Sequence, residues 1–190
     1  MASMKWWYLK NFFSNEESEY FRKYLKLNND SKLKDPVNQS KKKKCDVYMS
    51  RILDIRIDPN MHTLFKRLEN VVRHANHKQF SVDIDPLDNY SNIFLQEYKG
   101  SNFDHYDFHF DGEPDDVAGE QKLTCLINVS GKKFTGGEFV LFDGDECLVP
   151  ELNDKGSLLI FPSYHLHSVK PVKKGTRSVA VVWFLGPRWR

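Results

Sequence analysis

From residue 80 onward the sequence is a succession of short segments that have the length and composition of β-strands. Each segment is rich in β-branched and aromatic residues and is bounded by Gly, Pro, Asp or Asn. The segments are FSVDI, SNIFLQEY, the residues around 105–111, LTCLINVS, GEFVLF, GSLLIF, LHSVKPV and RSVAVVWFL. So many short strands in succession, without an internal repeat, predict a β jelly roll or barrel.

Two helices are predicted before this region. Ser14 and Glu17 form a capping-box pattern, and the apolar residues that follow recur at helical spacing, which predicts a helix over residues 15–27. A second helix is predicted after the start signal Asp58, Pro59, Asn60, because an apolar stripe begins at Met61.

The chain has 190 residues, of which 40% are hydrophobic. A chain of this length fits a single hydrophobic core. We therefore expect one domain over residues 1–190, of mainly β (α+β) class. Residues 1–79 would supply helical support and a flexible basic loop, and residues 80–190 would form the β core.

The polar segment between the two predicted helices contains four consecutive lysines, Lys41–Lys44. Such a run is usually a solvated loop. A mobile basic flap that closes over an acidic substrate is the functional alternative. The sequence does not decide between these two interpretations.

Composition bears on the compartment and the partners. The net charge of +2 is too small to favour a nucleic acid, and the basic residues are spread along the chain. No apolar run approaches the roughly 18 residues of a membrane span, and the N-terminal residues lack the layout of a signal peptide. Cys45, Cys125 and Cys147 show no CxxC spacing, which predicts free thiols in a reducing compartment. We expect a cytoplasmic protein with neither a membrane nor a nucleic-acid partner, and the sequence does not define its oligomeric state.

A histidine and an aspartate two residues apart occur twice in succession, as His105 with Asp107 and as His109 with Asp111. Alternate side chains of a strand share a face, so all four are expected to point the same way, and periodicity does not choose between the pairs. The turn signal GEPDD follows Asp111 and places the later pair at the strand end, where a site can open to substrate.

Further candidate ligands lie in FPSYHLHSVKP, where His165 and His167 alternate along an expected strand. Two imidazoles and one carboxylate on Fe(II) leave positions open for co-substrate and oxygen, as in non-haem iron oxygenases. Zinc hydrolases can use a similar set. Arg177 follows His167 by ten residues. Its planar guanidinium suits a co-substrate carboxylate, although an ordinary surface ion pair is the alternative.

Taken together, these segments resemble a known family. YKG from Tyr98, YDFHFD from Tyr106, GGEF from Gly136 and FPSYHLHSVKPVKKGTR ending at Arg177 resemble the prolyl-4-hydroxylase-like branch of the Fe(II)- and 2-oxoglutarate-dependent dioxygenases. The resemblance runs from residue 93 to the C-terminus. It implies a double-stranded β-helix, a distorted jelly roll, braced by N-terminal helices.

The resemblance also implies a ligand set. The family has an aromatic residue two spacers before its HxD motif, which Tyr106 matches, and this selects His109 and Asp111. HSVKPV selects His167 as the third ligand. His105 and His165 would then not bind the metal. They would pack in the fold, contact the metal ligands or face the substrate.

The co-substrate contacts follow in the same way. Arg177 matches the basic residue that pairs with the distal carboxylate of 2-oxoglutarate, and Tyr98 matches a tyrosine that helps to hold this co-substrate. The spacing from Tyr98 to His109 is longer than in several relatives. Relatives often have a further polar contact on the strand LTCLINVS, where Thr124 and Asn128 are the candidates.

The resemblance finally implies an activity. The enzyme would use Fe(II), 2-oxoglutarate as co-substrate and O2, with ascorbate as a candidate reductant, and would release succinate and CO2. It would hydroxylate an unactivated C–H bond, favouring a prolyl residue in a peptide or protein. The alternatives are a hydroxylase of a free amino acid or other small molecule, and a non-catalytic metal-binding jelly roll. A nucleic-acid demethylase would need a second arginine and a more basic surface.

Overall fold

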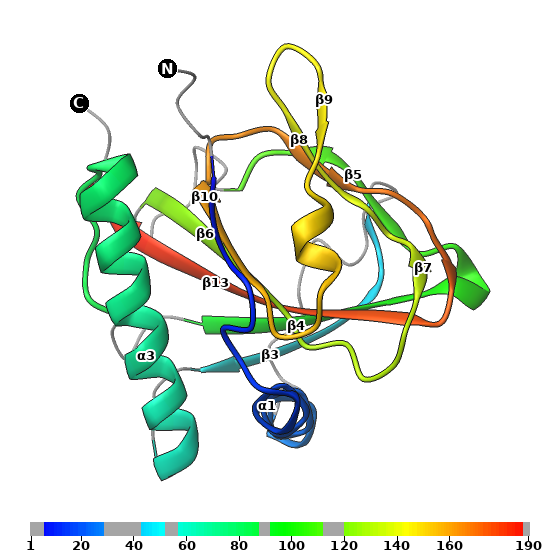
Figure 1. Ribbon diagram of the computed structural model, residues 1–190, viewed down its shortest axis with the longest axis horizontal. Helices are drawn as coiled ribbons and strands as arrows, with labels where there is room; N and C mark the ends of the chain where they lie inside the picture. The colour runs from blue at the N-terminus through cyan, green and yellow to red at the C-terminus, as the bar shows by residue number, and fades with distance from the viewer. Residues whose placement is uncertain (1–5, 29–42, 52–56, 88–91, 112–119, 188–190) are drawn as a thin grey trace.

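The strands form two sheets that face each other and a short two-stranded ribbon (Figure 1). A computed structural model describes residues 6–28, 43–51, 57–87, 92–111 and 120–187. The larger sheet has the order β1-β10-β6-β13-β4-β3, the smaller has the order β2-β5-β11-β8-β9, and β12 pairs with β7. This arrangement confirms the expected double-stranded β-helix.

The strands have the following bounds. The six-stranded sheet contains β1 (Trp7–Leu9), β3 (Asp46–Arg51), β4 (Asn92–Lys99), β6 (Glu120–Asn128), β10 (Leu158–Pro162) and β13 (Thr176–Gly186). The five-stranded sheet contains β2 (Lys43–Lys44), β5 (His105–His109), β8 (Phe139–Phe142), β9 (Glu146–Leu148) and β11 (His167–Val169). The ribbon contains β7 (Thr135–Gly136) and β12 (Val172–Lys174). Short turns of helix are η2 (Asn76–Phe80), η3 (Gly100–Asn102) and η4 (Pro150–Asn153).

Both predicted helices are present, as α1 (Asn15–Leu27) and α3 (Pro59–Ala75). The capping box at Ser14 is complete, because its hydroxyl accepts from the Glu17 backbone N–H and the Glu17 carboxylate accepts from the Ser14 N–H. Asp58 caps α3 by accepting from two backbone N–H groups of its first turn. No helix in the described part of the chain is long and apolar enough to cross a bilayer.

Strand β13 shows how the sheet separates two hydrophobic cores. Ala180, Val182 and Phe184 pack under the helices, whereas Val179 and Val181 face the space between the sheets. The alternation follows from the two-residue period of a strand. Burying an aliphatic or aromatic side chain completely stabilises the folded state by roughly 1.5–3 kcal/mol. The helices therefore fix the larger sheet from outside, and the space between the two sheets holds the second core.

Residues before 80 also contribute strands, which the sequence analysis did not predict. Strand β3 extends the larger sheet by pairing with β4, and β2 pairs with β5. Lys43 and Lys44 therefore lie in a strand, whereas Lys41 and Lys42 lie outside the described residues. These strands were missed because they contain or adjoin a lysine run that is typical of solvated loops.

Two predicted strands differ in the structure. FSVDI was predicted as a strand, but η2 ends at Phe80 and the next residues join no sheet. The backbone of Val82 is bonded instead to the amide side chain of Asn76, which accepts from its N–H and donates to its carbonyl. LHSVKPV is divided between β11 and β12 at Pro171, which has no backbone N–H to donate to a ladder.

Candidate metal and co-substrate site

Strand β5 contains a β-bulge that decides which of its side chains face the interior. His167 is opposite His109, but Val169, two residues further along β11, is opposite Tyr106. Strand β5 therefore has one extra residue between Tyr106 and His109, and these two side chains share a face. Their rings stack with centroids 3.5 Å apart.

The bulge distinguishes the two His–Asp pairs. The side chains of His105 and Asp107 are 31% and 58% exposed, whereas those of His109 and Asp111 are 16% and 10% exposed. The expectation that all four share one face is therefore wrong, because strict alternation does not hold across a bulge. The later pair faces the interior.

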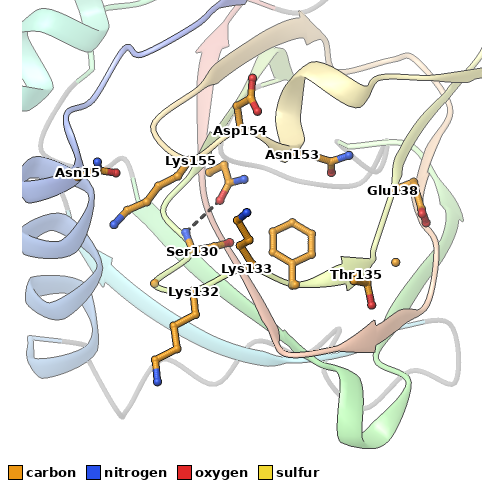
Figure 2. Close-up of a pocket in the computed structure, with 13 residues that line it drawn as sticks. Asn15, Ser130, Lys132, Lys133, Thr135, Glu138, Asn153, Asp154 and Lys155 are labelled. Carbon is orange, nitrogen blue, oxygen red and sulfur yellow. Dashed lines mark hydrogen bonds between the residues drawn. The ribbon is translucent and has the colours of Figure 1, made fainter.

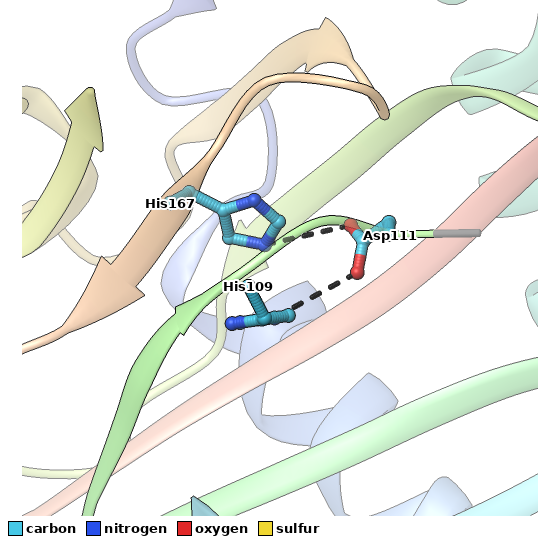
Figure 3. A group of neighbouring side chains, drawn as sticks. All are labelled: His109, Asp111 and His167. Atoms are coloured by element: carbon cyan, nitrogen blue, oxygen red, sulfur yellow. Dashed lines mark ion pairs between the residues drawn. The ribbon is translucent and has the colours of Figure 1, made fainter. Parts of the chain in front are cut away.

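His109, Asp111 and His167 come together where β5 ends and β11 begins (Figure 3). One potential ligand atom of each lies within 4.8 Å of the others. The His167 Nε2 is 3.5 Å from Asp111 Oδ2, and the His109 Nε2 is 3.8 Å from Asp111 Oδ1. Among the described residues, no other group of three or more His, Cys, Asp or Glu side chains has this geometry.

Backbone carbonyls orient both imidazoles. The Nδ1 atoms of His109 and His167 are each 2.8 Å from a carbonyl oxygen two residues back, those of Asp107 and His165. A carbonyl can only accept, so each Nδ1 carries the proton and each Nε2 keeps its lone pair. Both lone pairs are therefore available to a metal, and the donor set of two imidazoles and a carboxylate fits Fe(II).

Asp111 is held by Thr124 on β6 and by Ser163, which follows β10. Thr124 Oγ1 donates to Asp111 Oδ2 at 2.7 Å and lies 2.9 Å from the Ser163 hydroxyl. The Asp111 N–H also donates to the Ser163 carbonyl. The sequence offered two candidate polar contacts on LTCLINVS, Thr124 and Asn128. Thr124 lies beside the metal-ligand candidates, because it contacts Asp111. Asn128 does not, because its amide bonds the backbone of Leu152 and Ser130.

Arg177 is buried inside the barrel without an acidic partner. It is 2% exposed, its Nε has no hydrogen-bond partner, and no ion pair joins it to an acid of the described residues. Its guanidinium carbon lies 5.4 Å from the centroid of the Tyr98 ring. Tyr98 is the residue of β4 that lies opposite Arg177 on β13. Burial lowers the pKa of Arg177, against smaller opposing effects of Tyr98 and Cys45. A buried guanidinium in this state is stabilised by an anionic ligand.

Tyr98 supplies a hydroxyl beside this guanidinium. Burial raises the pKa of Tyr98 well above its usual value, so the hydroxyl stays protonated at neutral pH. It donates to Gln96 Oε1 at 2.7 Å. Gly137 supplies room on the other side, because a Cβ at this residue would come within 3.0 Å of Arg177 Cδ. The GGEF segment therefore lets the chain pass close to Arg177.

Two interior residues were not singled out from the sequence. Trp183 lies opposite Thr124 in the sheet, and its buried Nε1 has no hydrogen-bond partner among the residues that the structure describes. Ser163 is fully buried and completes the hydrogen bonds around Asp111. Ser163 stands within FPSYHLHSVKP, but the spacing of that segment marked only its histidines, and Trp183 belongs to no recognisable motif.

A separate cavity of ≈ 670 Å³ lies near the N-terminus of α1, between the segment that follows β6 and the turn η4 (Figure 2). Most of the residues that line it have polar side chains, among them Lys133, Lys155 and Ser130. Neither the three metal-ligand candidates nor Arg177 and Tyr98 line it. It is therefore distinct from the candidate site between the sheets.

The fold and this site define a barrel with a buried arginine and a His–Asp–His group that could hold a metal ion, and comparisons with known proteins agree. The profile of the 2OG-Fe(II) oxygenase superfamily matches residues 93–185. A PKHD-type hydroxylase of Prochlorococcus marinus (strain MIT 9515) is 40% identical over 83 residues, which cover 42% of this chain and 35% of that protein. The chain thus spans about a third of the length of that curated relative.

Solved structures share the fold over nearly the whole chain. A Pseudomonas putida prolyl-4-hydroxylase has a TM-score of 0.71 at 16% identity and covers 99% of this chain and 95% of its own. A Trichoplax adhaerens prolyl hydroxylase, solved with a peptide fragment of the hypoxia inducible factor oxygen degradation domain, has a TM-score of 0.69 at 17% identity and covers 96% and 84%. Residues 93–185 are therefore similar to the 2OG-Fe(II) oxygenase superfamily, and the fold is that of the two prolyl hydroxylase structures.

Proposed function

We propose that the chain is an Fe(II)- and 2-oxoglutarate-dependent dioxygenase that hydroxylates an unactivated C–H bond of a prolyl residue in a peptide or protein, with release of succinate and CO2. The observation that carries this proposal is Arg177, a buried guanidinium in the same barrel as the His–Asp–His group that no acid of the described residues pairs with. A jelly roll that only bound a metal would have no use for it.

Each residue of the site has a part in the proposed reaction. His109, Asp111 and His167 would hold Fe(II), and Thr124 would fix the orientation of the Asp111 carboxylate through its hydrogen bond. Arg177 would pair with the distal carboxylate of 2-oxoglutarate as a charge-assisted fork. An Fe(II) ion held by His109, Asp111 and His167 would supply the redox chemistry that couples the oxidative decarboxylation of 2-oxoglutarate to oxidation of the substrate.

The substrate class rests on the relatives. The Trichoplax enzyme was solved with a peptide fragment, and both solved neighbours named above are prolyl hydroxylases. Since one fold hosts many acceptors, the prolyl residue is the finer part of the proposal. A free amino acid or other small molecule is the competing acceptor.

The test is a substrate panel incubated with the protein, Fe(II), 2-oxoglutarate and O2. The panel contains prolyl peptides, the same peptides with alanine in place of proline, and free amino acids. Mass spectrometry would detect a gain of one oxygen, and succinate would be measured in parallel. We expect oxidation of prolyl peptides only, and none with the His167→Ala variant.

The other outcomes separate the parts of the proposal. Oxygen gained only by free amino acids would overturn the peptide substrate and leave the reaction class standing. Absence of both succinate and 2-oxoglutarate binding would overturn the dioxygenase itself.

A further inference from the structure

The exposed aromatic side chains of the protein are concentrated beside the candidate metal site. Among the described residues, five Phe or Tyr side chains are exposed, and four of them belong to β5, to β8 or to the segments that follow β5 and β10. These four are Phe108, Phe110, Phe142 and Tyr164, with exposed fractions of 36%, 58%, 42% and 53%. We call them the aromatic rim. Apolar side chains that gather at the surface mark interaction sites, whereas single ones are ordinary.

Phe110 and Tyr164 lie on the solvent-facing side of the ligand candidates. Phe110 stands between His109 and Asp111, whose side chains are 16% and 10% exposed, so solvent reaches the group here. Tyr164 follows Ser163, whose carbonyl accepts from the Asp111 N–H at 3.1 Å. Since alternate residues of an extended chain point to opposite faces, Phe110 points away from the two ligand candidates. It therefore borders the site and does not occupy the metal position.

Phe108 and Phe142 extend the rim over the outer face of the smaller sheet. Phe139 and Leu141 of β8 face the core between the sheets, so the side chain of Phe142 faces outward. The rings of Phe108 and Phe142 meet edge to face, with centroids 6.0 Å apart. Strand β11 lies between β5 and β8, so this contact crosses β11 on the outer face. The rim thus continues from the ligand candidates across three strands.

The outer face has a charged border. Glu146, opposite Phe142 on β9, is joined to Lys170 by an ion pair of 2.9 Å. Because these two charges compensate each other, the surface favours an apolar partner over a charged one. The helices α1 and α3 pack against the larger sheet instead (Figure 1). The aromatic rim is therefore an apolar surface with a charged border, as in many protein interaction sites.

We propose that the aromatic rim binds the substrate chain beside the residue that is oxidised and selects a large apolar side chain there. This inference rests on the proposed function, in which the substrate is a peptide or protein. A chain whose reacting residue lies at the metal site passes Phe110, which stands between two of the ligand candidates. A second copy of the protein seated on the rim would instead cover this side of the site.

The size of the rim sets the position of the selected side chain. From β5 to β8 there are two inter-strand spacings of about 4.8 Å, or about 10 Å in all. An extended peptide covers this distance with about three residues. We therefore expect the apolar side chain about two to four residues from the oxidised residue, on one side of it only.

The test is a series of prolyl peptides that have glycine and serine at all other positions, with leucine introduced at one position at a time on either side of the proline. We expect leucine at neighbouring positions on one side to lower KM about 10-fold, a value typical of a well-packed interface side chain. Binding of the same peptides, labelled with fluorescein and followed by anisotropy with Mn(II) in place of Fe(II) and without O2, should show the same preference.

Substitution of Phe142 tests the rim itself. Phe142→Ser should remove the preference, so that the KM values for serine and leucine peptides converge. Phe142→Leu should keep it, because leucine preserves the apolar surface. Phe103→Ser is the matched control and should leave the preference unchanged, since Phe103 is 61% exposed after η3, outside the rim. Binding of 2-oxoglutarate, measured in parallel, reports whether the site is intact in each variant.

The outcomes separate the two proposals. If 2-oxoglutarate is bound but no peptide is bound or oxidised, the peptide substrate is wrong and the role of the rim is wrong with it. If all the peptides are oxidised with the same KM, or if the leucine preference survives in Phe142→Ser, the role of the rim alone is wrong. A preference lost equally in Phe103→Ser would also contradict it. A dimer in sedimentation velocity that Phe142→Ser dissociates, with the preference unchanged, would assign the surface to a second copy.

Discussion

The hydroxyl of Thr124 donates a hydrogen bond of 2.7 Å to the carboxylate of Asp111. Thr124 is on β6 of the larger sheet, and Asp111 lies two residues after the end of β5 of the smaller sheet. The bond therefore joins the two sheets at the candidate metal centre. It also fixes the rotation of the carboxylate, so that the position of this ligand depends on a residue that would not itself bind the metal.

Replacing Thr124 by valine should weaken metal binding without removing a ligand. Valine keeps the shape of threonine but has no hydroxyl, and the loss of such an outer contact typically costs about 10- to 100-fold in metal affinity. Thr124→Ser should bind nearly as well as wild type. Competition titration with Fe(II) or Co(II) would measure the affinities. Thr63→Val, on the exposed face of α3, is the control; an equal loss in both variants would contradict this role.

The two His–Asp pairs should respond differently to substitution. His109→Ala and Asp111→Ala should each abolish iron-dependent succinate release, because they remove inner-facing ligand candidates. His105→Ala and Asp107→Ala should retain most of the activity, because the bulge leaves these side chains more exposed. Iron content and succinate would be measured for all four. Inactive His105 and Asp107 variants with active His109 and Asp111 variants would reverse this assignment.

The difference between these pairs also shows what the sequence could predict. Local signals predicted both helices, because capping residues and an apolar stripe act within a few residues. The bulge in β5 was not predictable from alternation, because an extra residue is defined only by the partner strand. The resemblance nevertheless selected His109, because the family motif places an aromatic residue three positions before the histidine. The bulge brings residues with this spacing, Tyr106 and His109, onto the same face of β5.

The co-substrate side of the site was predictable only in part. Arg177 and Tyr98 could be named from motifs, but their placement opposite each other depends on the pairing of β13 with β4. Strand β3, which pairs with the other edge of β4, was obscured by the lysine run beside it. Contacts between residues far apart in sequence are set by strand pairing, which composition and spacing do not encode.

The ion pair between Arg67 and Glu17 should make stability depend on pH. Two hydrogen bonds, of 3.0 and 2.8 Å, join Arg67 on α3 to Glu17 on α1. This pairing holds the pKa of Glu17 below its ordinary value, against the opposing effect of burial. Because the pKa is lower in the folded state, the stabilisation is present above the unfolded-state pKa and is lost as the pH falls through the folded-state pKa.

Glu17→Gln should therefore be less stable than wild type at neutral pH by about 0.5 kcal/mol, a small value because both side chains are partly exposed. The difference should shrink as the pH falls below about 4. Urea unfolding at several pH values would measure it, and a double-mutant cycle with Arg67→Met would isolate the pair. A difference that stays constant down to low pH would assign the effect to the capping box instead.

Replacing Arg177 by methionine should separate stability from co-substrate binding. An unpaired buried guanidinium destabilises the fold, so Arg177→Met should be more stable than wild type by about 1–2 kcal/mol when no co-substrate is present. The same variant should bind 2-oxoglutarate about 10- to 100-fold more weakly, since a charge-assisted contact contributes roughly 1.5–3 kcal/mol. Arg177→Lys should recover part of this affinity, because it keeps the charge but not the planar fork. Iron affinity should not change in either variant.

Thermal unfolding with and without 2-oxoglutarate would measure both effects, and Arg73→Met, on the surface of α3, serves as the control. If Arg177→Met were destabilised and still gained the wild-type increase in melting temperature from 2-oxoglutarate, Arg177 would be a structural residue and not the anchor of the co-substrate.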